Sequence, residues 1–550
     1  MGKQTPQFNN GFEISGNIVD VINRRIFPGT IFIKNQIISQ INPHPGTFKT
    51  FIMPGFVDAH VHIESSMLSP CEFGRVSLLH GTVASVSDPH EIANVLGLKG
   101  IRFMRESASK TPFSICLGAP PCVPATSHET SGATISLSDI EELFRSQTTA
   151  YLAEVMNWPG VLARDSDVMG KIAIAKRYNK PIDGHAPGLS GEMARAYVEA
   201  GITTDHECSN LEEALEKISY GMNILIREGS AAKNFSSLIE LLRYHPKSIM
   251  FCSDDLHPND LLRSHINGLV KRAVGMGFDI FDVLSAACVN PVKHYGLPVG
   301  LLQPRDRADF IEVNNLVDFH ILQTFIAGKC VAKNASSLLE HVSEETITCM
   351  NCKTVSPEDI EVPLEREHIR VIQVIPGELL TEEFIIGAKA TNGRVTSDVE
   401  RDILKLVVIN RYRQAPVARA FVRGFNLSSG ALSSTVAHDS HNIIAVGVSD
   451  EEIVRAVNAI IETAGGIAVA SEDSVHVLPL PNAGLMSNAA ASCVAAQYEF
   501  LDRKSKDLGS RLPAPFMTLS FLALLVIPQL KLSDQGLFDG RAFKYTELFV

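Results

Sequence analysis

Two histidines separated by one residue, His60 and His62, are the first residues whose types and spacing could bind a metal ion. The run from residue 56 to 62 alternates as a β-strand does, and side chains two apart on a strand point to the same side. Both imidazoles can therefore bind one ion. Asp58 lies on that side one step earlier, where it could orient a ligand. A buried strand with two incidental histidines is the competing interpretation, so the prediction depends on ligands later in the chain.

Candidate ligands recur at the ends of later predicted strands. They are Glu154, His185, His206 and the pair Asp254-Asp255. Four histidines and two carboxylates suffice for two divalent ions bridged by one carboxylate and one hydroxide: His60, His62, Glu154, His185, His206 and Asp254. Imidazole with carboxylate suits Zn, Fe or Mn about equally. Neighbouring strand residues point to opposite faces, so the sequence leaves open whether Asp254 or Asp255 faces the ions.

Short apolar strands, separated by helical patterns, must position these ligands. Helices are predicted at 138–146, 168–178, 191–200 and 211–218. The predicted strands are eight, at 56–62, 81–86, 113–117, 151–155, 181–185, 202–206, 223–226 and 249–253. Eight is the number that a (β/α)8 TIM-like barrel needs, and in such barrels the chemistry lies at the carboxyl ends of the strands. The sequence therefore predicts an α/β, metal-dependent barrel with its ligands at one end.

Further β-structure is predicted on both sides of the barrel. Turn residues Gly16, Pro28-Gly29 and 43–46 punctuate short strands between 12 and 52, and β character returns at 308–313 and 325–331. We expect the two flanks to pair into one small β-sandwich domain. The predicted division is 1–53 and 301–340 for this domain, 54–300 for the barrel, 341–369 for a linker and 370–550 for a C-terminal α+β domain. In the last, strands are expected at 369–374, 404–409 and 443–448, and a helix at 450–463.

The composition, 45% hydrophobic and 20% charged, is ordinary for a globular protein. The net charge of −12 argues against nucleic acid or an anionic membrane as a partner. The N-terminus lacks the apolar segment of a signal peptide, and the ten cysteines are scattered, which fits a reducing cytoplasm. We therefore expect a cytoplasmic protein. Barrels of this kind often self-associate, so a homodimer is the working hypothesis.

The conspicuous polar cluster of the C-terminal part is His438-Asp439-Ser440-His441-Asn442, directly before the apolar strand expected at 443–448. Spacing alone favours a surface turn for this cluster.

Longer strings of residues give the chain a family resemblance. The order His-x-His, Glu, His, His, Asp on a barrel resembles the amidohydrolase superfamily. Nearly the whole chain, including its C-terminal region, resembles the adenine deaminase family within it. Glu154 stands at the bridging position where many binuclear relatives have a carboxylated lysine, and this suits that family. The supporting strings are PGFVDAHVHIESSM at 54–67, SDPHEIAN at 87–94, GHAP at 184–187, SDD at 253–255 and AHDSHN at 437–442.

The resemblance implies hydrolytic deamination of adenine to hypoxanthine and ammonia in purine salvage, by a hydroxide that bridges two Mn(II) or Fe(II) ions. The cluster at 438–442 would then cap the barrel mouth. Asp254 would pass the proton of the hydroxide to the departing amino group, with Asp255 as the competing residue. Glu64 is the first candidate for the acid that protonates the purine ring, ahead of Ser66 and Glu91. Possible substrate or lid residues are Ser66, Asp88, His90, Glu91, Asp255, His438, Asp439 and His441.

Two other functions stay open. The nearer is another amidohydrolase reaction, on a cyclic amide or an N-acetyl group, with the barrel and metals unchanged. The remoter is a non-catalytic barrel scaffold. Such scaffolds typically lose metal ligands, whereas every predicted ligand position is filled here.

Overall fold

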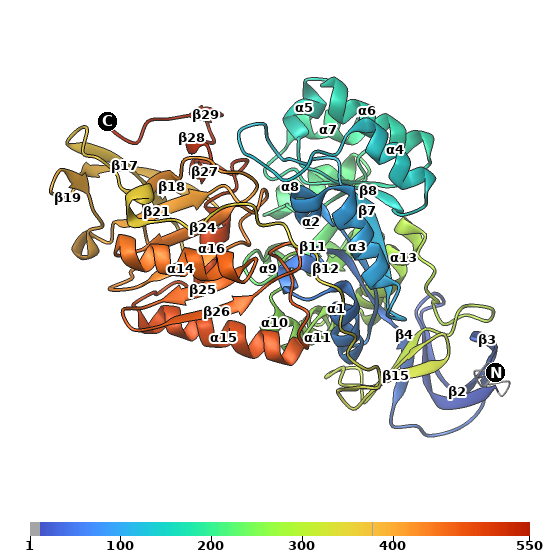
Figure 1. Cartoon of the computed structure of the whole chain (residues 1–550). Helices are drawn as coiled ribbons and strands as arrows, with labels where there is room; N and C mark the ends of the chain where they lie inside the picture. The colour runs from blue at the N-terminus through green and yellow to red at the C-terminus, as the bar shows by residue number, and fades with distance from the viewer. Residues whose placement is uncertain (1–10, 377) are drawn as a thin grey trace, which may run out of the picture.

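The structure is a computed structural model that describes residues 11–376 and 378–550 (Figure 1), and its barrel domain is built on a closed ring of parallel strands. Strands β5 to β9 pair in sequence order, as do β10 to β12. Between β9 and β10, the Thr203 amide donates to the Ile182 carbonyl at 2.8 Å. Between β12 and β5, a parallel β-bridge joins Val61 to Asp254 and closes the ring. The predicted eight-stranded barrel is confirmed: β5 (Phe56–Val61), β6 (Thr82–Ser87), β7 (Ser114–Ala119), β8 (Tyr151–Val155), β9 (Ile182–Gly184), β10 (Thr204–Asp205), β11 (Asn223–Arg227) and β12 (Ile249–Cys252).

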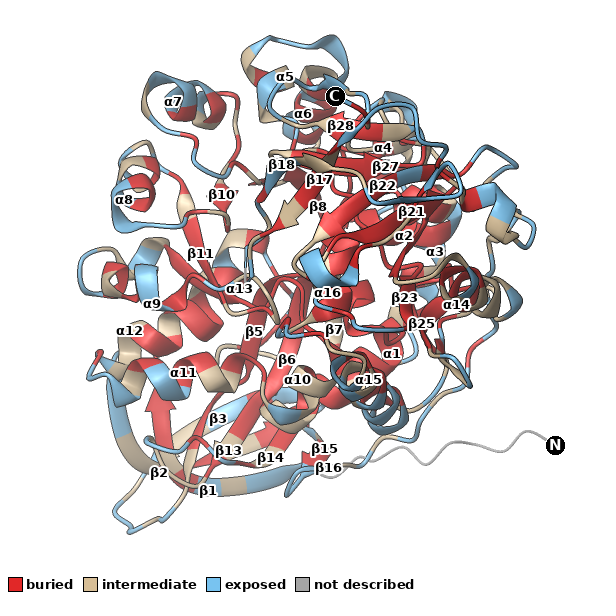
Figure 2. Ribbon diagram, turned by 90° about the vertical axis from the view of Figure 1, so that its left-hand side faces the viewer, coloured by how far each residue is buried: buried red, intermediate tan, exposed pale blue. Residues whose placement is uncertain are grey.

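Helices surround this ring, and their outer faces are exposed while the strands are buried (Figure 2). The four helices predicted from the sequence are confirmed as α4, α6, α7 and α8. In α4, Ser136 and Asp139 form a capping box that fixes the first turn. The helices of the barrel are α1 (Pro70–Ser77), α2 (His90–Leu96), α3 (Leu98–Ala108), α4 (Leu137–Arg145), α5 (Trp158–Leu162), α6 (Ser166–Arg177), α7 (Gly191–Glu199), α8 (Leu211–Ser219), α9 (Phe235–Leu238), α10 (Pro258–Arg263), α11 (Ile266–Gly275), α12 (Ile280–Leu284) and α13 (Asn290–Tyr295).

The two flanks of the barrel join in one small sheet, as expected. Antiparallel pairing of β4 with β13 connects them. A β-bridge between Ile37 and Arg307 also joins β3, the edge strand of the N-terminal flank, to the segment that precedes β13. Apolar side chains of both flanks, such as Ile31 and Phe310, share one core. In spatial order the strands are β16 (Ser336–Ser337), β15 (Lys329–Lys333), β14 (Ile321–Ile326), β13 (Phe310–Val313), β4 (Phe51–Pro54), β1 (Phe12–Asp20), β2 (Arg25–Lys34) and β3 (Ile37–Pro43).

Two details of this sheet differ from the sequence prediction. Gly16 and Pro28-Gly29 are not turns, because Gly16 pairs with Gly29 inside the β1–β2 hairpin. A Cβ on Gly29 would lie 2.8 Å from the Asn42 carbonyl oxygen, so glycine here allows close packing. The strand predicted at 325–331 is instead the end of β14 and the start of β15, since the chain turns at Ala327 and Gly328 with φ of 49° and 76°.

The C-terminal domain is built on a second mixed sheet and lies beside the barrel on the left of Figure 1. The expected strands and helix are confirmed as β17, β21, β24 and α14. The sheet runs β18 (Thr381–Gly387), β17 (His368–Val374), β22 (Ala418–Arg423), β21 (Leu404–Ile409), β24 (Ile443–Gly447), β23 (Ala431–Ser434), β25 (Gly466–Ala470), β26 (Val475–Pro479). Its other elements are α14 (Asp450–Glu462), α15 (Ala491–Asp507), α16 (Pro515–Phe521), β19 (Ala390–Thr391), β20 (Arg394–Val395), β27 (Leu530–Ser533), β28 (Gly536–Asp539) and β29 (Lys544–Tyr545).

Polar contacts hold this domain against the barrel. The Glu72 carboxylate of α1 accepts from the Ala491 amide of α15 at 2.7 Å, and Arg263 of α10 pairs with Glu499 of α15 at 2.6 Å. The domain therefore faces the carboxyl ends of the barrel strands. Across the described ranges, we find no helix that is long and apolar enough to cross a bilayer.

Candidate metal centre and active site

The barrel brings the strand-end histidines of β5 together with Asp254. His60 Nε2 lies 3.6 Å and His62 Nε2 3.4 Å from Asp254 Oδ1, and the two ring nitrogens are 3.2 Å apart. Ligand atoms about 2.1 Å from one ion lie roughly 3 to 4 Å from each other. All three residues are buried. Their spacing therefore suits one shared divalent ion.

Glu154, at the end of β8, lies between this group and the next two histidines. Its Oε2 is 3.1 Å from His185 Nδ1 and 3.2 Å from His206 Nε2, and its Oε1 is 3.8 Å from His62 Nε2. One carboxylate thus faces ligands of both groups. The structure brings together all the residues proposed as metal ligands, with Glu154 between the two groups.

The geometry favours Asp254 over Asp255 as the residue that faces the histidines. β12 ends at Cys252, so the strand alternation no longer applies. Asp254 has a φ of 55°, a conformation that aspartate tolerates. Its amide donates to the His60 carbonyl at 2.9 Å, which ties it to β5. Asp255 instead accepts a hydrogen bond from the Ser65 hydroxyl at 2.5 Å.

The sequence predicted that Asp58 orients a metal-binding histidine, but its carboxylate contacts the ring of neither His60 nor His62. Its carboxylate accepts from the Ser253 amide at 2.9 Å and lies 2.8 Å from His265 Nε2. Asp58 therefore connects β5 to the end of β12 and to α11, where the barrel closes.

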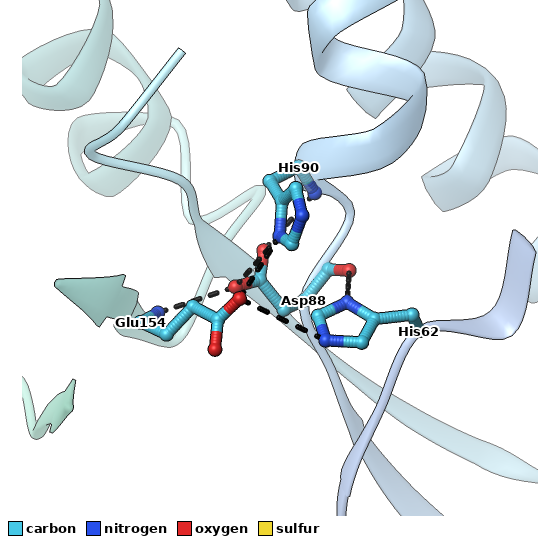
Figure 3. Close-up of side chains that lie close together, drawn as sticks. All are labelled: His62, Asp88, His90 and Glu154. Atoms are coloured by element: carbon cyan, nitrogen blue, oxygen red, sulfur yellow. Dashed lines mark hydrogen bonds and ion pairs between the residues drawn. The ribbon is translucent and has the colours of Figure 1, made fainter. Parts of the chain in front are cut away.

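Asp88 and His90, proposed as substrate or lid residues, lie among the ligands (Figure 3). His90 Nδ1 is 3.4 Å from Glu154 Oε1 and 3.4 Å from Asp88 Oδ2. Asp88 also accepts from the Glu154 amide at 3.2 Å, and its carbonyl oxygen is 3.3 Å from His62 Nδ1. His62, Asp88, His90 and Glu154 form a further group that could hold an ion. The string SDPHE at the end of β6 is the signal that points to it.

The polar cluster of the C-terminal domain is buried, so the surface turn that spacing favoured is wrong. His438 Nδ1 lies 2.7 Å from one oxygen of Glu91, and His441 contacts the other. Asp439 Oδ1 is 3.8 Å from His90 Nε2. Within the C-terminal domain, the fully buried Arg411 holds this loop by donating to the His441 carbonyl at 3.2 Å and the Ala483 carbonyl at 2.5 Å.

Glu64 and Ser66 lie behind the wall of the site. Glu64 Oε1 accepts from the Ile92 amide at 3.2 Å, and the Ser66 hydroxyl donates to the Ile63 carbonyl at 2.6 Å. Burial, together with Glu91, raises the pKa of Glu64 to about 7. Of these candidate acids, Glu91 lines the cavity and Glu64 does not.

Two charged residues of the site escaped the sequence analysis. Arg227 donates from Nη1 to Asp254 Oδ2 at 2.8 Å and from Nη2 to Glu207 Oε2 at 2.9 Å. Glu207 follows His206 directly. Arg227 is the last residue of the otherwise apolar strand β11. A charged residue at a strand end was the sequence signal that could have identified it.

The cavity beside these groups measures about 50 Å³. Ionisable side chains form one wall, and the C-terminal domain forms the other with Leu379, Phe521, Leu524, Val526 and Ile527. Phe521 stacks on His438 with ring centres 4.8 Å apart. The cavity has room for a few water molecules.

Comparison with known proteins assigns the family. Residues 51–331 match the model of the amidohydrolase family, and residues 378–544 match the adenine deaminase C-terminal domain. An adenine deaminase of Sulfurovum sp. (strain NBC37-1) is 52% identical over 97% of this chain and 99% of its own. Those of Salinibacter ruber and Methanosarcina mazei are 49% and 47% identical, over 98% and 97% of this chain and 99% of each relative. The chain belongs to the adenine deaminase family.

Amidohydrolases are metal-dependent, and the donor set of this adenine deaminase family member fits a divalent metal centre. Burial and the neighbouring His206 and His62 lower the pKa of His60 well below its usual value. Burial would lower the pKa of His185 too, but the Glu207 and Glu154 carboxylates raise it to about 9. Buried imidazoles crowded around shared carboxylates are the arrangement that bound cations stabilise.

Proposed function

We propose that this protein hydrolyses adenine to hypoxanthine and ammonia. The observation that carries the proposal is the group of strand-end ligands around Glu154, which faces a cavity closed by the adenine deaminase C-terminal domain. Relatives named adenine deaminase, about half identical over nearly the whole chain, support the same substrate.

We propose His60, His62, Glu154, His185, His206 and Asp254 as the ligands of two divalent ions, with His90 beside them. Two such ions would lower the pKa of water from about 15.7 toward roughly 7 and supply hydroxide at neutral pH. Mn(II) or Fe(II) is the proposed native metal, on the family resemblance alone, because histidine and carboxylate suit Zn about equally.

Asp254 is proposed to transfer the proton. Arg227 holds its Oδ2 at 2.8 Å, while Oδ1 faces the histidines. The Arg227 guanidinium and the histidines keep the pKa of the Asp254 carboxyl well below its usual value, although burial alone would raise it. Asp254 is therefore an ionised base that accepts a proton from the attacking water and returns it to the departing amino group.

Glu91 replaces Glu64 as the proposed acid for the purine ring. It lines the cavity and is held by His438 and His441. Although burial would lower the pKa of His438, Glu91 raises it to about 9, so the pair carries a proton at neutral pH. His438 is proposed to supply that proton to Glu91, and Glu91 to a ring nitrogen.

We also propose that the protein acts in the cytoplasm as a homodimer. Scattered cysteines, all free in the described residues, support a reducing compartment. Size-exclusion chromatography with light scattering tests the dimer: a mass of one chain would contradict it.

The test of function is ammonia release from adenine by protein loaded with Mn(II) under reducing, anaerobic conditions. His62→Ala removes a proposed ligand, and His320→Ala, at an exposed histidine, is the matched control. We expect hypoxanthine from the unaltered protein and the control, and none from His62→Ala. Metal bound without adenine turnover would favour the cyclic-amide or N-acetyl reaction instead. Neither metal nor turnover would contradict the catalytic proposal.

A further inference from the structure

Arg227 contacts two carboxylates of the site, and the proposed reaction accounts only for its contact with Asp254 and not for its contact with Glu207. Arg227 is the last residue of β11, between the strands that carry His206 and Asp254. Its residue surface is 8% exposed. Among the described residues that line the cavity, Arg227 is the one lysine or arginine. A buried guanidinium needs carboxylate partners to offset its desolvation.

The first partner is Asp254, at 2.8 Å from Nη1 to Oδ2. This contact engages one carboxylate oxygen and leaves Oδ1 directed at His60 and His62, at 3.6 and 3.4 Å. The planar guanidinium has its donors in a fixed geometry. It therefore determines which oxygen of Asp254 turns towards the proposed ions.

The second partner is Glu207, which both Nη atoms contact. Glu207 Oε1 lies 3.6 Å from His185 Nδ1 and 3.5 Å from His206 Nε2, close to the distances of Glu154 from the same two nitrogens. His185, His206 and Glu207 are by themselves a group that could hold an ion. Glu207 could therefore bind an ion at these two histidines in place of Glu154. The forked contact with Arg227 engages both carboxylate oxygens of Glu207.

The backbone fixes Arg227 in this position. Its amide donates to Asn234 Oδ1 at 2.8 Å, and Asn234 Nδ2 donates to the His206 carbonyl at 3.1 Å. Arg227 and His206 therefore keep a fixed relation at the ends of neighbouring strands.

We propose that Arg227 is a positioning residue that orients Asp254 and keeps Glu207 out of the metal-ligand set. The effect on turnover rests on the proposed deamination of adenine, whereas the effect on the ligand set does not.

The test compares Arg227→Gln with the double variant Arg227→Gln/Glu207→Gln. Arg195→Gln is the control, since Arg195 makes an exposed ion pair with Glu199 within α7. The measurements are kcat and KM for adenine with Mn(II), and the visible spectrum of the Co(II)-loaded protein, which reports coordination without substrate. Circular dichroism establishes that each variant is folded.

We expect Arg227→Gln to lower kcat about 10- to 100-fold, as loss of a group that orients a ligand does, with KM changed less than about twofold. Its Co(II) spectrum should differ from that of the unaltered protein. Removing the Glu207 charge as well should restore the spectrum and recover part of kcat.

An unchanged spectrum and kcat in Arg227→Gln would overturn the proposal, as would a double variant no better than the single one. A raised KM at constant kcat would make Arg227 a substrate contact and also overturn it. If Arg227→Gln does not fold, Arg227→Lys takes its place, with a smaller loss expected because an ammonium cannot form the fork. If the unaltered protein leaves adenine intact, the proposed function fails, and the Co(II) spectra alone decide the role of Arg227.

Discussion

At the scale of single residues, the site depends on how carboxylates are shared among histidines. Glu154 lies within 3.8 Å of ring nitrogens of four histidines, which follow strands β5, β6, β9 and β10. Asp254 has one oxygen on Arg227 and the other towards His60 and His62. Each carboxylate is thereby held in one orientation. Because of these orientations, we propose different roles for two carboxylates: Glu154 as a metal ligand shared by both groups, and Asp254 as the residue that transfers the proton.

Asp254→Asn should abolish the base while keeping a side chain of the same shape. We expect kcat to fall about 100- to 10,000-fold, the usual contribution of general acid–base catalysis. Asp255→Asn should cost much less, because Asp255 is hydrogen-bonded to Ser65. Steady-state kinetics with Mn(II) checks both variants, and equal losses would contradict the assignment to Asp254.

Metal affinity should rise with pH up to about 9. The carboxylates of Glu207 and Glu154 raise the pKa of His185 to about 9 against the effect of burial, so this histidine is protonated at neutral pH in the metal-free protein. Only neutral imidazole binds a metal, so protons compete with the ion below that pH. Titration of Mn(II) into the apoprotein between pH 6.5 and 9 measures the trend. An affinity that stays constant or falls over that range would contradict it.

At the scale of elements, the closure of the barrel between β5 and β12 positions the ligands. Asp58 binds the Ser253 amide and lies 2.8 Å from His265 Nε2, and the Asp254 amide donates to the His60 carbonyl. These contacts fix the relative height of the two strands. Because His60, His62 and Asp254 follow directly, their spacing depends on this closure.

Asp58→Asn should destabilise the fold and weaken metal binding together. An amide has only one acceptor oxygen, so either the Ser253 amide or His265 loses its partner in a buried place, at a cost of about 1–3 kcal/mol. Urea unfolding of the apoprotein and Mn(II) titration measure the two effects. Glu141→Gln, at an exposed ion pair with Arg177, is the control and should change neither. Unchanged stability in Asp58→Asn would contradict this account.

At the scale of the whole molecule, the C-terminal domain completes the active site. It supplies His438 and His441 to Glu91 and an apolar wall around Phe521 to the cavity. Phe521, Leu524 and Ile527 belong to a small apolar cluster of their own, separate from the main cores. Ala231 of the barrel packs against this cluster, so the wall lies at the boundary between the two domains.

Phe521→Ala should raise KM for adenine more than it lowers kcat. Loss of an aromatic contact in a pocket weakens binding by about 1–3 kcal/mol, or roughly 10- to 200-fold. The metal ligands do not involve this residue, so metal content should stay constant. Kinetics and metal analysis together check the prediction. Met517→Ala, in the same apolar cluster but outside the cavity lining, is the control. An equal rise in KM there would mean that the wall acts only through stability.

Much of this architecture could be predicted from the sequence. The eight strands and the places of His60, His62, Glu154, His185 and His206 follow from short apolar runs that end in polar residues. Such runs are local patterns, and the parallel closure of a barrel brings all strand ends to one rim. Local pattern plus one topology rule was therefore enough to gather the proposed ligands.

Only the tertiary structure decided the remaining features. The choice between Asp254 and Asp255 depends on a backbone turn after β12, beyond the range of strand alternation. The burial of His438, the contacts of Arg227 with Glu207 and Asp254, and the wall at Phe521 join segments that are distant in the chain. Such contacts are set by how domains and strand ends pack together, which residue spacing along the chain does not encode.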